Sequence, residues 1–229
     1  METAQQAHTP AGKPTTPRSA GRTARNSLFW ALLIPTVTSA AGFLGQFPYG
    51  GLWAGVLVIL ATAAVGATVA GAKWHRSGAA TIVGFGVFAL SLFAGPALYE
   101  AYAKEFGERV GAVVVLTGER SGTKGDGEYY CHVIDDAGEV SELGNQQNCF
   151  GDFAEEQHVV LYKDPLGVLA PWIEATDDRS VDPIGPGITA GLFLLVGGSM
   201  LTAGLRRRSD RDLLEEQRRR HDPPWHSPS

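Results

Sequence analysis

Two cysteines and two nearby histidines are the side chains of this sequence best suited to chemistry. Cys131 and Cys149 are its only thiols, and His132 and His158 lie in the same region. The thiols could pair as a disulfide, or all four side chains could ligate a metal ion. Neighbouring side chains in a strand point to opposite faces, which makes Cys131 and His132 poor ligands for one ion. We favour a Cys131–Cys149 disulfide in an oxidising compartment over the alternative metal site.

Clustered carboxylates are the second candidate for chemistry. Asp135, Asp136 and Glu139 form one cluster, and a second cluster comprises Asp177, Asp178 and Asp182. Neither cluster has the ligand spacing of a twelve-residue calcium loop. A single sequence also gives no means of pairing distant carboxylates across a glycosidase site. We interpret these residues as solvated acidic surface, with Asp135, Asp136 and Glu139 as a candidate interaction surface.

Motifs of known catalytic sites are missing from the sequence. It contains no Gly-x-Ser-x-Gly elbow, phosphate-binding glycine loop, zinc-protease helix or kinase signature. The histidines outside the cysteine region lie in expected tails or loops: His8, His75, His221 and His226. We therefore predict no catalytic residue, no cofactor-binding residue and no enzymatic activity.

The elements that must position these side chains follow from the placement of charge. Three stretches contain no charged residue and no histidine: 26–72, 77–99 and 183–205. A helix of about 20 apolar residues crosses a bilayer core of about 30 Å. Pro48, Gly50 and Gly51 predict a tight turn that divides the first stretch. The sequence therefore predicts four transmembrane helices, at about 28–45, 52–72, 78–99 and 184–205, and excludes a soluble globular enzyme.

The charged segments predict how these helices are oriented. Residues 1–27 carry a net charge of +3, the loop with Lys73 and Arg76 carries +2, and the tail 206–229 carries +2. Residues 100–183 hold six basic and 18 acidic residues, a net charge of −12. Lys and Arg near the ends of spans favour the cytoplasmic side. We expect a multi-pass protein of the cell membrane with cytoplasmic termini and an extracytoplasmic insert.

The first apolar segment has a second interpretation. Arg22 and Arg25, an apolar run and the small residues 38–40 resemble a signal peptide with its cleavage site. The long polar leader and the apolar stretch beyond Ala40 favour an uncleaved first span. Residues 1–27 are rich in Pro, Thr, Ala and Gln, and we predict that they are disordered.

The insert reads as short strands separated by turns. Alternating or Val-rich segments predict strands at 110–117, 128–134, 139–143, 158–162 and 168–173, with turns at 126–127 and 135–138. A short helix at 100–108 should continue from the third span. Five short antiparallel strands favour a small barrel or a tightly curled sheet. The predicted fold class is thus a membrane α-helical protein with a small all-β, barrel-like extracytoplasmic domain over 100–183.

Several motifs of this region resemble those of a known family. They are the Gly-x-x-Val-x-Ala-x-Val-Val strand at 107–115, a Tyr-Tyr-x-x-x-Ile-x-Asp run at 129–136, the Gly-Asp pair at 151–152 and Val-Leu-Tyr-Lys-Asp-Pro at 160–165. The chain is similar over about 95–205 to bacterial membrane proteins, common in actinomycetes, that carry a small β-barrel domain of unknown function between transmembrane helices. It departs from them in its cysteine pair, the long 151–157 turn and Leu166-Gly167. The resemblance implies fold and location but no activity.

Two glycine pairs and the composition of the spans bear on function. Gly51/Gly55 and Gly187/Gly191 have the spacing that allows helices to approach closely, and we expect packing within the bundle rather than a dimer motif. The predicted spans contain no ionisable residue, which disfavours a coupled transporter or pump. The tail's net charge of +2 disfavours nucleic acid as a partner.

The function favoured by these observations is binding rather than catalysis. We predict a non-enzymatic envelope protein that binds or organises a partner through its acidic outer domain. The expected partners are the lipid bilayer and an envelope or membrane protein. The alternative is a membrane-embedded accessory subunit of a transporter or of a lipid or cell-wall enzyme.

Overall fold

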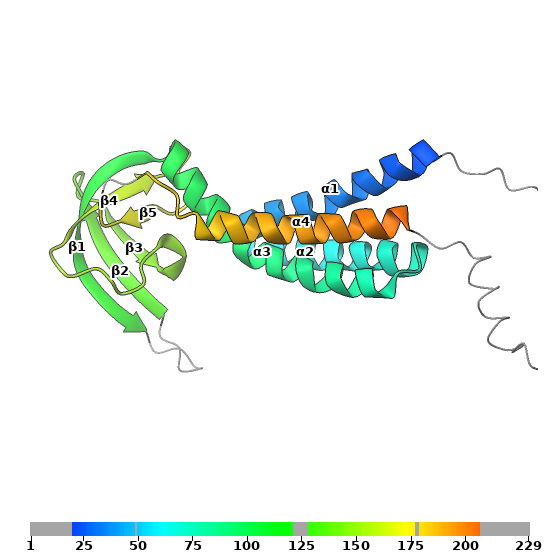
Figure 1. Cartoon of the computed structure of the whole chain (residues 1–229). Helices are drawn as coiled ribbons and strands as arrows, with labels where there is room; N and C mark the ends of the chain where they lie inside the picture. Colours follow the sequence, from blue (N-terminus) through cyan, green and yellow to red (C-terminus); the bar gives the residue numbers. More distant parts are fainter. Residues whose placement is uncertain (1–19, 49, 121–127, 177–178, 207–229) are drawn as a thin grey trace, which may run out of the picture.

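The structure is a computed structural model that describes residues 20–48, 50–120, 128–176 and 179–206. Four long helices lie side by side, and a curled sheet is attached at one end of them (Figure 1). The start of α1, the connection from α2 to α3 and the end of α4 all lie at the opposite end (Figure 1). The helices and the sheet therefore form two parts of one elongated molecule.

The helices are α1 (Ala20–Leu44), α2 (Gly51–Thr68), α3 (Ser77–Phe106) and α4 (Ile184–Leu205), and a π-helical turn, η1 (Val69–Lys73), extends α2. All four are long and apolar enough to cross a membrane, and the segment formed by α2 and η1 counts as one of them. At 1.5 Å per residue, the 22 residues of the shortest, α4, reach about 33 Å.

Two helices are longer than predicted. Helix α1 begins at Ala20, so residues 20–27, which we predicted to be disordered, are helical; residues 1–19 lie outside the described part of the chain. Within this extra stretch the hydroxyl of Ser27 donates to the carbonyl of Thr23. Helix α3 runs to Phe106 without a break and includes most of the short helix predicted at 100–108.

The helices pack around a core of aliphatic side chains and close glycine contacts. Ile34, Val83, Val87 and Met200 are almost fully buried in this core. A Cβ atom on Gly55 would lie 2.7 Å from the carbonyl oxygen of Ala41, so the first predicted glycine pair packs within the bundle. The second pair does not, because a Cβ atom on either Gly187 or Gly191 would have no neighbour within 4 Å.

The sheet is antiparallel and has the strand order β3-β2-β1-β4-β5. Its members are β1 (Glu108–Arg120), β2 (Glu128–Asp135), β3 (Val140–Gly144), β4 (His158–Lys163) and β5 (Trp172–Glu174). The long central strand β1 pairs with both β2 and β4, and its register with β2 shifts between Val114 and Leu116. Among the described residues β3 and β5 form the two edges, so the curled sheet is a half-barrel rather than a closed barrel.

Two predicted features of the insert differ from the structure or fall outside it. The strand predicted at 168–173 is reduced to β5, because the backbone N–H groups of Val168 and Leu169 donate to the carboxylate of Asp164. Those bonds fold the segment into a turn instead of a ladder. The turn predicted at 126–127 lies outside the described residues.

Candidate functional site

The two cysteines lie together in the core of the sheet domain. Their sulfur atoms are at disulfide-bonding distance, with the Cα atoms 6.2 Å apart. Cys131 belongs to β2, and Cys149 follows the short 3-10 helix η2 (Asn145–Gln147). Both are completely buried in one cluster with Val133 and Leu143. The pair thus fastens the irregular segment after β3 to the central part of the sheet.

The alternative metal site has no support in the described part of the chain. The described residues contain no group of three or more His, Cys, Asp or Glu side chains placed to ligate an ion. His132 follows Cys131 in β2 but is partly exposed, and its Nε2 atom lies 3.9 Å from a carboxylate oxygen of Glu142. The opposite faces of the strand therefore separate the imidazole from the buried sulfur.

The acidic cluster predicted as an interaction surface is not uniformly solvated. Asp135 is only 5% exposed, and its carboxylate accepts hydrogen bonds from Lys163 Nζ at 2.5 Å and from the N–H groups of Ala137 and Glu139. Glu139 shares the same ammonium group at 2.7 Å. Asp136 is exposed. The prediction of a solvent-facing cluster is therefore wrong for Asp135, because a lysine from β4 neutralises it and the turn buries it.

The pKa directions agree with this structural role. The hydrogen bond from Lys163, followed by the backbone N–H of Glu139, lowers the pKa of the Asp135 carboxyl. The same hydrogen bond to Asp135, followed by the one to Glu139, raises the pKa of the Lys163 ammonium. Both groups are thus charged over a wider pH range than they would be in solution.

A third group of polar side chains joins the sheet domain to α3. The hydroxyl of Tyr102 in α3 donates to Asp164 at 2.8 Å, and three backbone N–H groups of the turn after β4 donate to the same carboxylate. Burial raises the pKa of Asp164, but the N–H of Leu169 and the other donors outweigh burial, so its pKa lies below the usual value. Asp164 therefore fixes both its own turn and the end of α3.

Lys104 is the centre of a buried charge cluster at the same junction. It is 6% exposed, and its Nζ atom lies 3.0 Å from Glu100, 2.8 Å from Glu174 and 2.7 Å from the carbonyl oxygen of Ser180. These groups come from α3, β5 and the segment that leads to α4. One ammonium group thus connects the bundle, the sheet and the return segment.

Aromatic packing completes the junction. Tyr99 of α3 donates to the carbonyl oxygen of Ala170 at 2.5 Å and meets the ring of Trp172 edge to face, with 5.5 Å between centroids. The buried side chains of Tyr162, Leu169 and Ala103 belong to the same cluster, and Phe43 and Phe47 pack against it. The sheet domain is therefore docked on the helices through an apolar interface with polar ties around it.

Sequence reasoning did not identify this junction. The spacing of Glu100 and Lys104 is a local signal, since residues four apart share a helix face. No local signal links Lys104 to Glu174, which lies 70 positions further along the chain. Of the second predicted acidic cluster, Asp182 accepts a hydrogen bond from the N–H of Ile184 at the start of α4. Asp177 and Asp178 lie outside the described residues.

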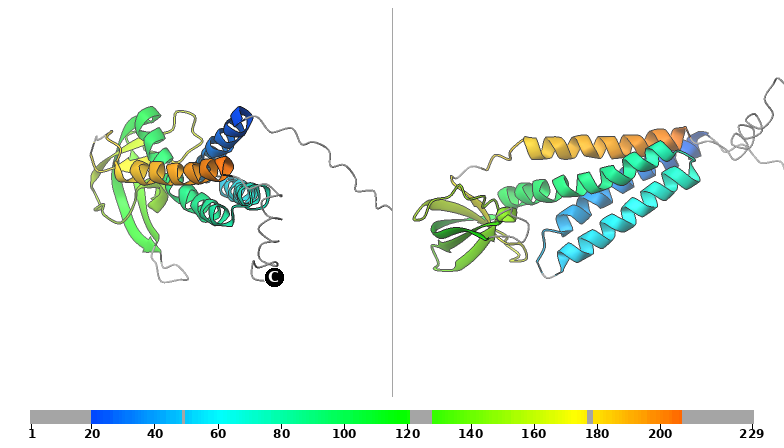
Figure 2. Two further views of the ribbon diagram at one scale, coloured as in Figure 1. Left: turned by 45° about the vertical axis from the view of Figure 1, so that its right-hand side comes forward. Right: turned by 90° about the horizontal axis from the view of Figure 1, so that it is seen from below.

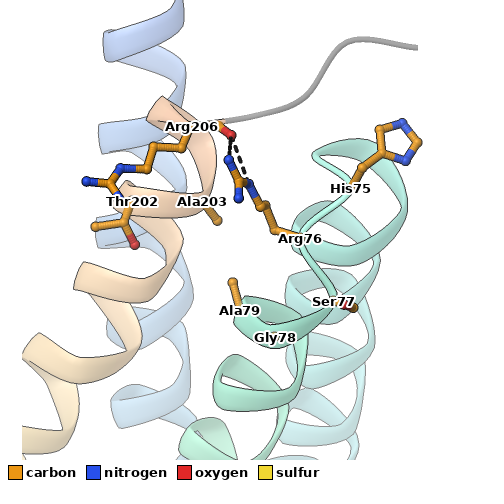
Figure 3. A pocket seen from close by; sticks show the side chains of 8 residues that line it. All are labelled: His75, Arg76, Ser77, Gly78, Ala79, Thr202, Ala203 and Arg206. Carbon is orange, nitrogen blue, oxygen red and sulfur yellow. Dashed lines mark hydrogen bonds between the residues drawn. The ribbon is translucent and has the colours of Figure 1, made fainter. Parts of the chain in front are cut away.

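A small cavity lies at the far end of the bundle. It has a volume of about 380 Å³ and lies between the start of α3 and the end of α4 (Figure 3). Arg76 spans it and donates through Nε, at 2.8 Å, and through a second nitrogen to the carbonyl oxygen of Arg206 (Figure 3). The side chain of His75 points away from α4 in the same view. Arg76 therefore ties two helix ends together there.

A larger cavity opens near the junction, between α1, α3 and α4. It has a volume of about 720 Å³, and its walls are mostly apolar. Among the described residues that line it, Glu105 is the only charged one. It is more spacious than the cavity at the far end of the bundle, and it lies on the helices rather than in the sheet domain.

Comparison with known proteins adds no functional assignment. No family model, no curated protein and no solved structure matches the chain. The family resemblance drawn from the sequence motifs stays a prediction.

Proposed function

We propose that this protein is a multi-pass membrane protein that presents its sheet domain on the extracytoplasmic surface and acts there by binding, not by catalysis. Four helices of sufficient length and apolarity support insertion. The ends of the described chain and the Lys73–Arg76 connection lie at one end of the bundle, and the acidic sheet domain lies at the other (Figure 1). The positive-inside bias then favours cytoplasmic termini.

The observation that carries the binding role is the fixed junction between bundle and sheet. Only Gly107 separates the end of α3 from the start of β1. The Lys104 cluster, the Tyr102–Asp164 bond and the Tyr99–Trp172 contact tie the sheet to the helices at three further points. A domain held this way keeps one orientation to the membrane, which suits a surface that recruits or organises a partner.

The surface offered to a partner is acidic. With Asp135 and Glu139 engaged by Lys163, the exposed carboxylates of the loop before β4 supply the binding charge: Asp152, Glu155 and Glu156. A one-sided negative field attracts basic partners at rates that fall with ionic strength. We therefore propose a basic peptide segment or basic envelope polymer as the partner.

The location is tested with single introduced cysteines and a membrane-impermeant maleimide on intact cells. Ser121→Cys should react in intact cells, whereas Ser209→Cys should react only after lysis. The native pair is expected to stay unlabelled, since both cysteines are buried and bonded. A reactive Ser209→Cys in intact cells would contradict the proposed orientation.

The binding role is tested with the full chain in nanodiscs and an oligolysine probe. Binding should saturate, weaken with added salt, and fall when Asp152, Glu155 and Glu156 are changed to Asn and Gln. A matched control removes the charges of Glu215 and Glu216 in the C-terminal tail, which we place on the other side. An equal loss of oligolysine binding in both variants would contradict the proposal. Binding that does not change with salt concentration would also contradict it.

The second candidate function, an accessory subunit in the membrane, has one observation in its favour. Gly187 and Gly191 on α4 face open space, and a small-residue face allows another helix to approach closely. Copurification of a second membrane protein that is lost on Gly191→Leu, with the sheet domain still folded, would favour this candidate over the first.

A further inference from the structure

The cavity between α1, α3 and α4 has the polarity of a site for an amphiphile. Along α1 it is lined by Thr36, Ser39, Ala40 and Phe43, and Phe193 of α4 closes part of the opposite side. On α3 it extends from Leu98 to Phe106. The polar groups that line it on α3, Tyr102 and Glu105, lie in the last turns of that helix beside the sheet domain. The charged end of the groove therefore lies beside the sheet domain, and the rest of its wall is mostly apolar, with Thr36 and Ser39 of α1 as the polar residues there.

The dimensions of this groove match one leaflet of a bilayer. Leu98 and Phe106 are eight residues apart, or about 12 Å along a helix. Half of a hydrocarbon core of about 30 Å is about 15 Å. On α4 the groove reaches Phe193, near the middle of the helix. Figure 2 shows α1, α3 and α4 lying alongside one another along the length of the bundle, with the sheet domain at one end.

One residue that lines the groove, Ser39, carries a polar atom without a hydrogen-bond partner in the described part of the chain. The hydroxyl oxygen of Ser39 is buried and has no hydrogen-bond partner among the described residues. Ser39 is five residues before the end of α1, which places it about 7.5 Å along the helix from the end that lies near the sheet domain. An orphan donor in an apolar wall costs free energy unless a ligand atom accepts from it. An ester carbonyl of a lipid is such an acceptor.

The charge at the mouth selects among lipids. Glu105 is exposed and is the only charged side chain among the described residues that line the groove. Lys104, on the same turn, is buried and directed to Glu100 and Glu174. A carboxylate at the mouth attracts an ammonium headgroup and repels a headgroup with net negative charge.

We infer that the groove binds one acyl chain of a phospholipid whose headgroup carries an amine, from the leaflet beside the sheet domain. The chain lies along the apolar wall, Ser39 donates to an ester carbonyl, and Glu105 meets the ammonium group. This inference rests on the proposed insertion in a membrane and adds a ligand that the binding role of the sheet domain does not require.

The test uses the full chain in vesicles of phosphatidylethanolamine and phosphatidylglycerol. A trace of either lipid carries a diazirine on its acyl chain, and the labelled peptides are mapped by mass spectrometry after irradiation. Phe85 and Leu92, which are 75% and 72% exposed, report ordinary contact with lipid. Residues 36–43 and 98–106 report the groove, and we expect the phosphatidylethanolamine probe to label them more strongly than the phosphatidylglycerol probe.

Groove-filling variants separate a bound lipid from passing contact. Ala40→Trp and Ala101→Phe fill the groove from opposite walls. If either variant costs the acyl chain the burial of two methylene groups, its affinity for the groove falls about tenfold. We expect groove labelling to fall by the same factor. Ala64→Trp is the matched control, since Ala64 is exposed on α2 outside the groove. Glu105→Gln should abolish the preference for phosphatidylethanolamine and leave labelling by the acyl chain in place.

Each other outcome overturns a defined part of the inference. Labelling of Phe85 and Leu92 without labelling of the groove, or groove labelling that ignores Ala40→Trp, rejects the lipid site. Equal labelling by the two probes rejects the role of Glu105. Failure to label Phe85 and Leu92 contradicts membrane insertion itself, and thus the proposed function.

Discussion

Cys131 and Cys149 show at the scale of single residues how a small core is reinforced. The disulfide joins β2 to the segment after η2, and both sulfur atoms lie among aliphatic side chains. A domain with so few strands buries little apolar surface on folding. In the chain-entropy model, a covalent link stabilises such a domain by restricting its unfolded chain.

Replacing both cysteines by serine should destabilise the sheet domain by about 3 kcal/mol, the chain-entropy value for a loop of this size. Thermal unfolding of the full chain in detergent, followed by near-ultraviolet circular dichroism, measures the effect. The unchanged protein with reductant added is the control and should unfold like the variant. Insertion should not change, because it depends on the helices. Two thiols labelled in the native, non-reduced protein would reject the bond.

Asp135 makes stability depend on pH in a predictable direction. Its pKa is lowered in the folded protein, so its contribution is present above its unfolded value of about 3.9 and is lost as pH falls through the folded value. The pKa of Lys163 is raised, so its contribution is present below about 10.4 and is lost as pH rises through the folded value. The pair should stabilise the domain most between those limits.

Asp135→Asn should lower the melting temperature at neutral pH and flatten the loss of stability in acid. The amide keeps the shape but cannot pair with the Lys163 ammonium as an anion. Asp136→Asn is the matched control, because Asp136 is adjacent and exposed and should change little. Melting curves from pH 3 to pH 8 measure both variants. Equal effects of the two substitutions would show that Asp135 is ordinary surface charge.

At the scale of elements, α3 connects the helix bundle directly to the sheet domain. It continues from the bundle into the junction and ends at Phe106, and β1 starts at Glu108. A Cβ atom on Gly107 would lie 2.9 Å from the Cβ of Tyr162, so the passage from helix to strand needs a residue without a side chain. Lys104 then secures the last turn of α3 to β5.

Lys104→Met should loosen the docked sheet domain, because it leaves Glu100 and Glu174 together without their cation. Removing the partner of a buried charged group lowers the free energy of unfolding by about 2 kcal/mol. Hydrogen exchange in β5 and the segment to α4 should rise. Adding Glu100→Gln and Glu174→Gln should recover part of the loss, since no uncompensated charge is then left. Glu108→Gln, at an exposed site nearby, is the control. Unchanged exchange in Lys104→Met would show that apolar contacts alone dock the domain.

At the scale of the whole molecule, close backbone contacts decide how the helices pack. A Cβ atom on Gly42 of α1 would lie 2.6 Å from the carbonyl oxygen of Ser91 in α3. On α4, Gly191 has no neighbour within 4 Å of the same position. The two glycines look alike in the sequence, but they have opposite surroundings in the bundle.

Gly42→Ala should therefore destabilise the bundle by about 1–3 kcal/mol, because the added methyl group meets backbone atoms that cannot move aside. Gly191→Ala should be neutral or slightly stabilising, since alanine is the better helix former. Thermal unfolding of helical structure in a mild detergent compares the two variants. A large effect of Gly191→Ala would reveal a contact with another chain at that face.

The sequence by itself determined the features that depend on local composition. Charge-free stretches predicted the four helices, and α4 was placed at its observed bounds, because crossing length and apolarity are properties of a continuous segment. Alternation predicted β2 and β4 closely for the same reason, since the period of a strand is local. The cysteine pair was predicted from the paired count together with the position of both thiols in the segment expected outside the cell.

Only the tertiary structure decided which charges are buried and where the concave sites lie. Asp135 meets Lys163 across 28 positions, Lys104 meets Glu174 across 70, and Tyr99 meets Ala170 across 71. The sheet's open edges and the groove between α1, α3 and α4 likewise depend on elements distant in the chain. A single sequence shows the type of each side chain. Its environment, which sets its charge state and its role, is made by residues that only folding brings near.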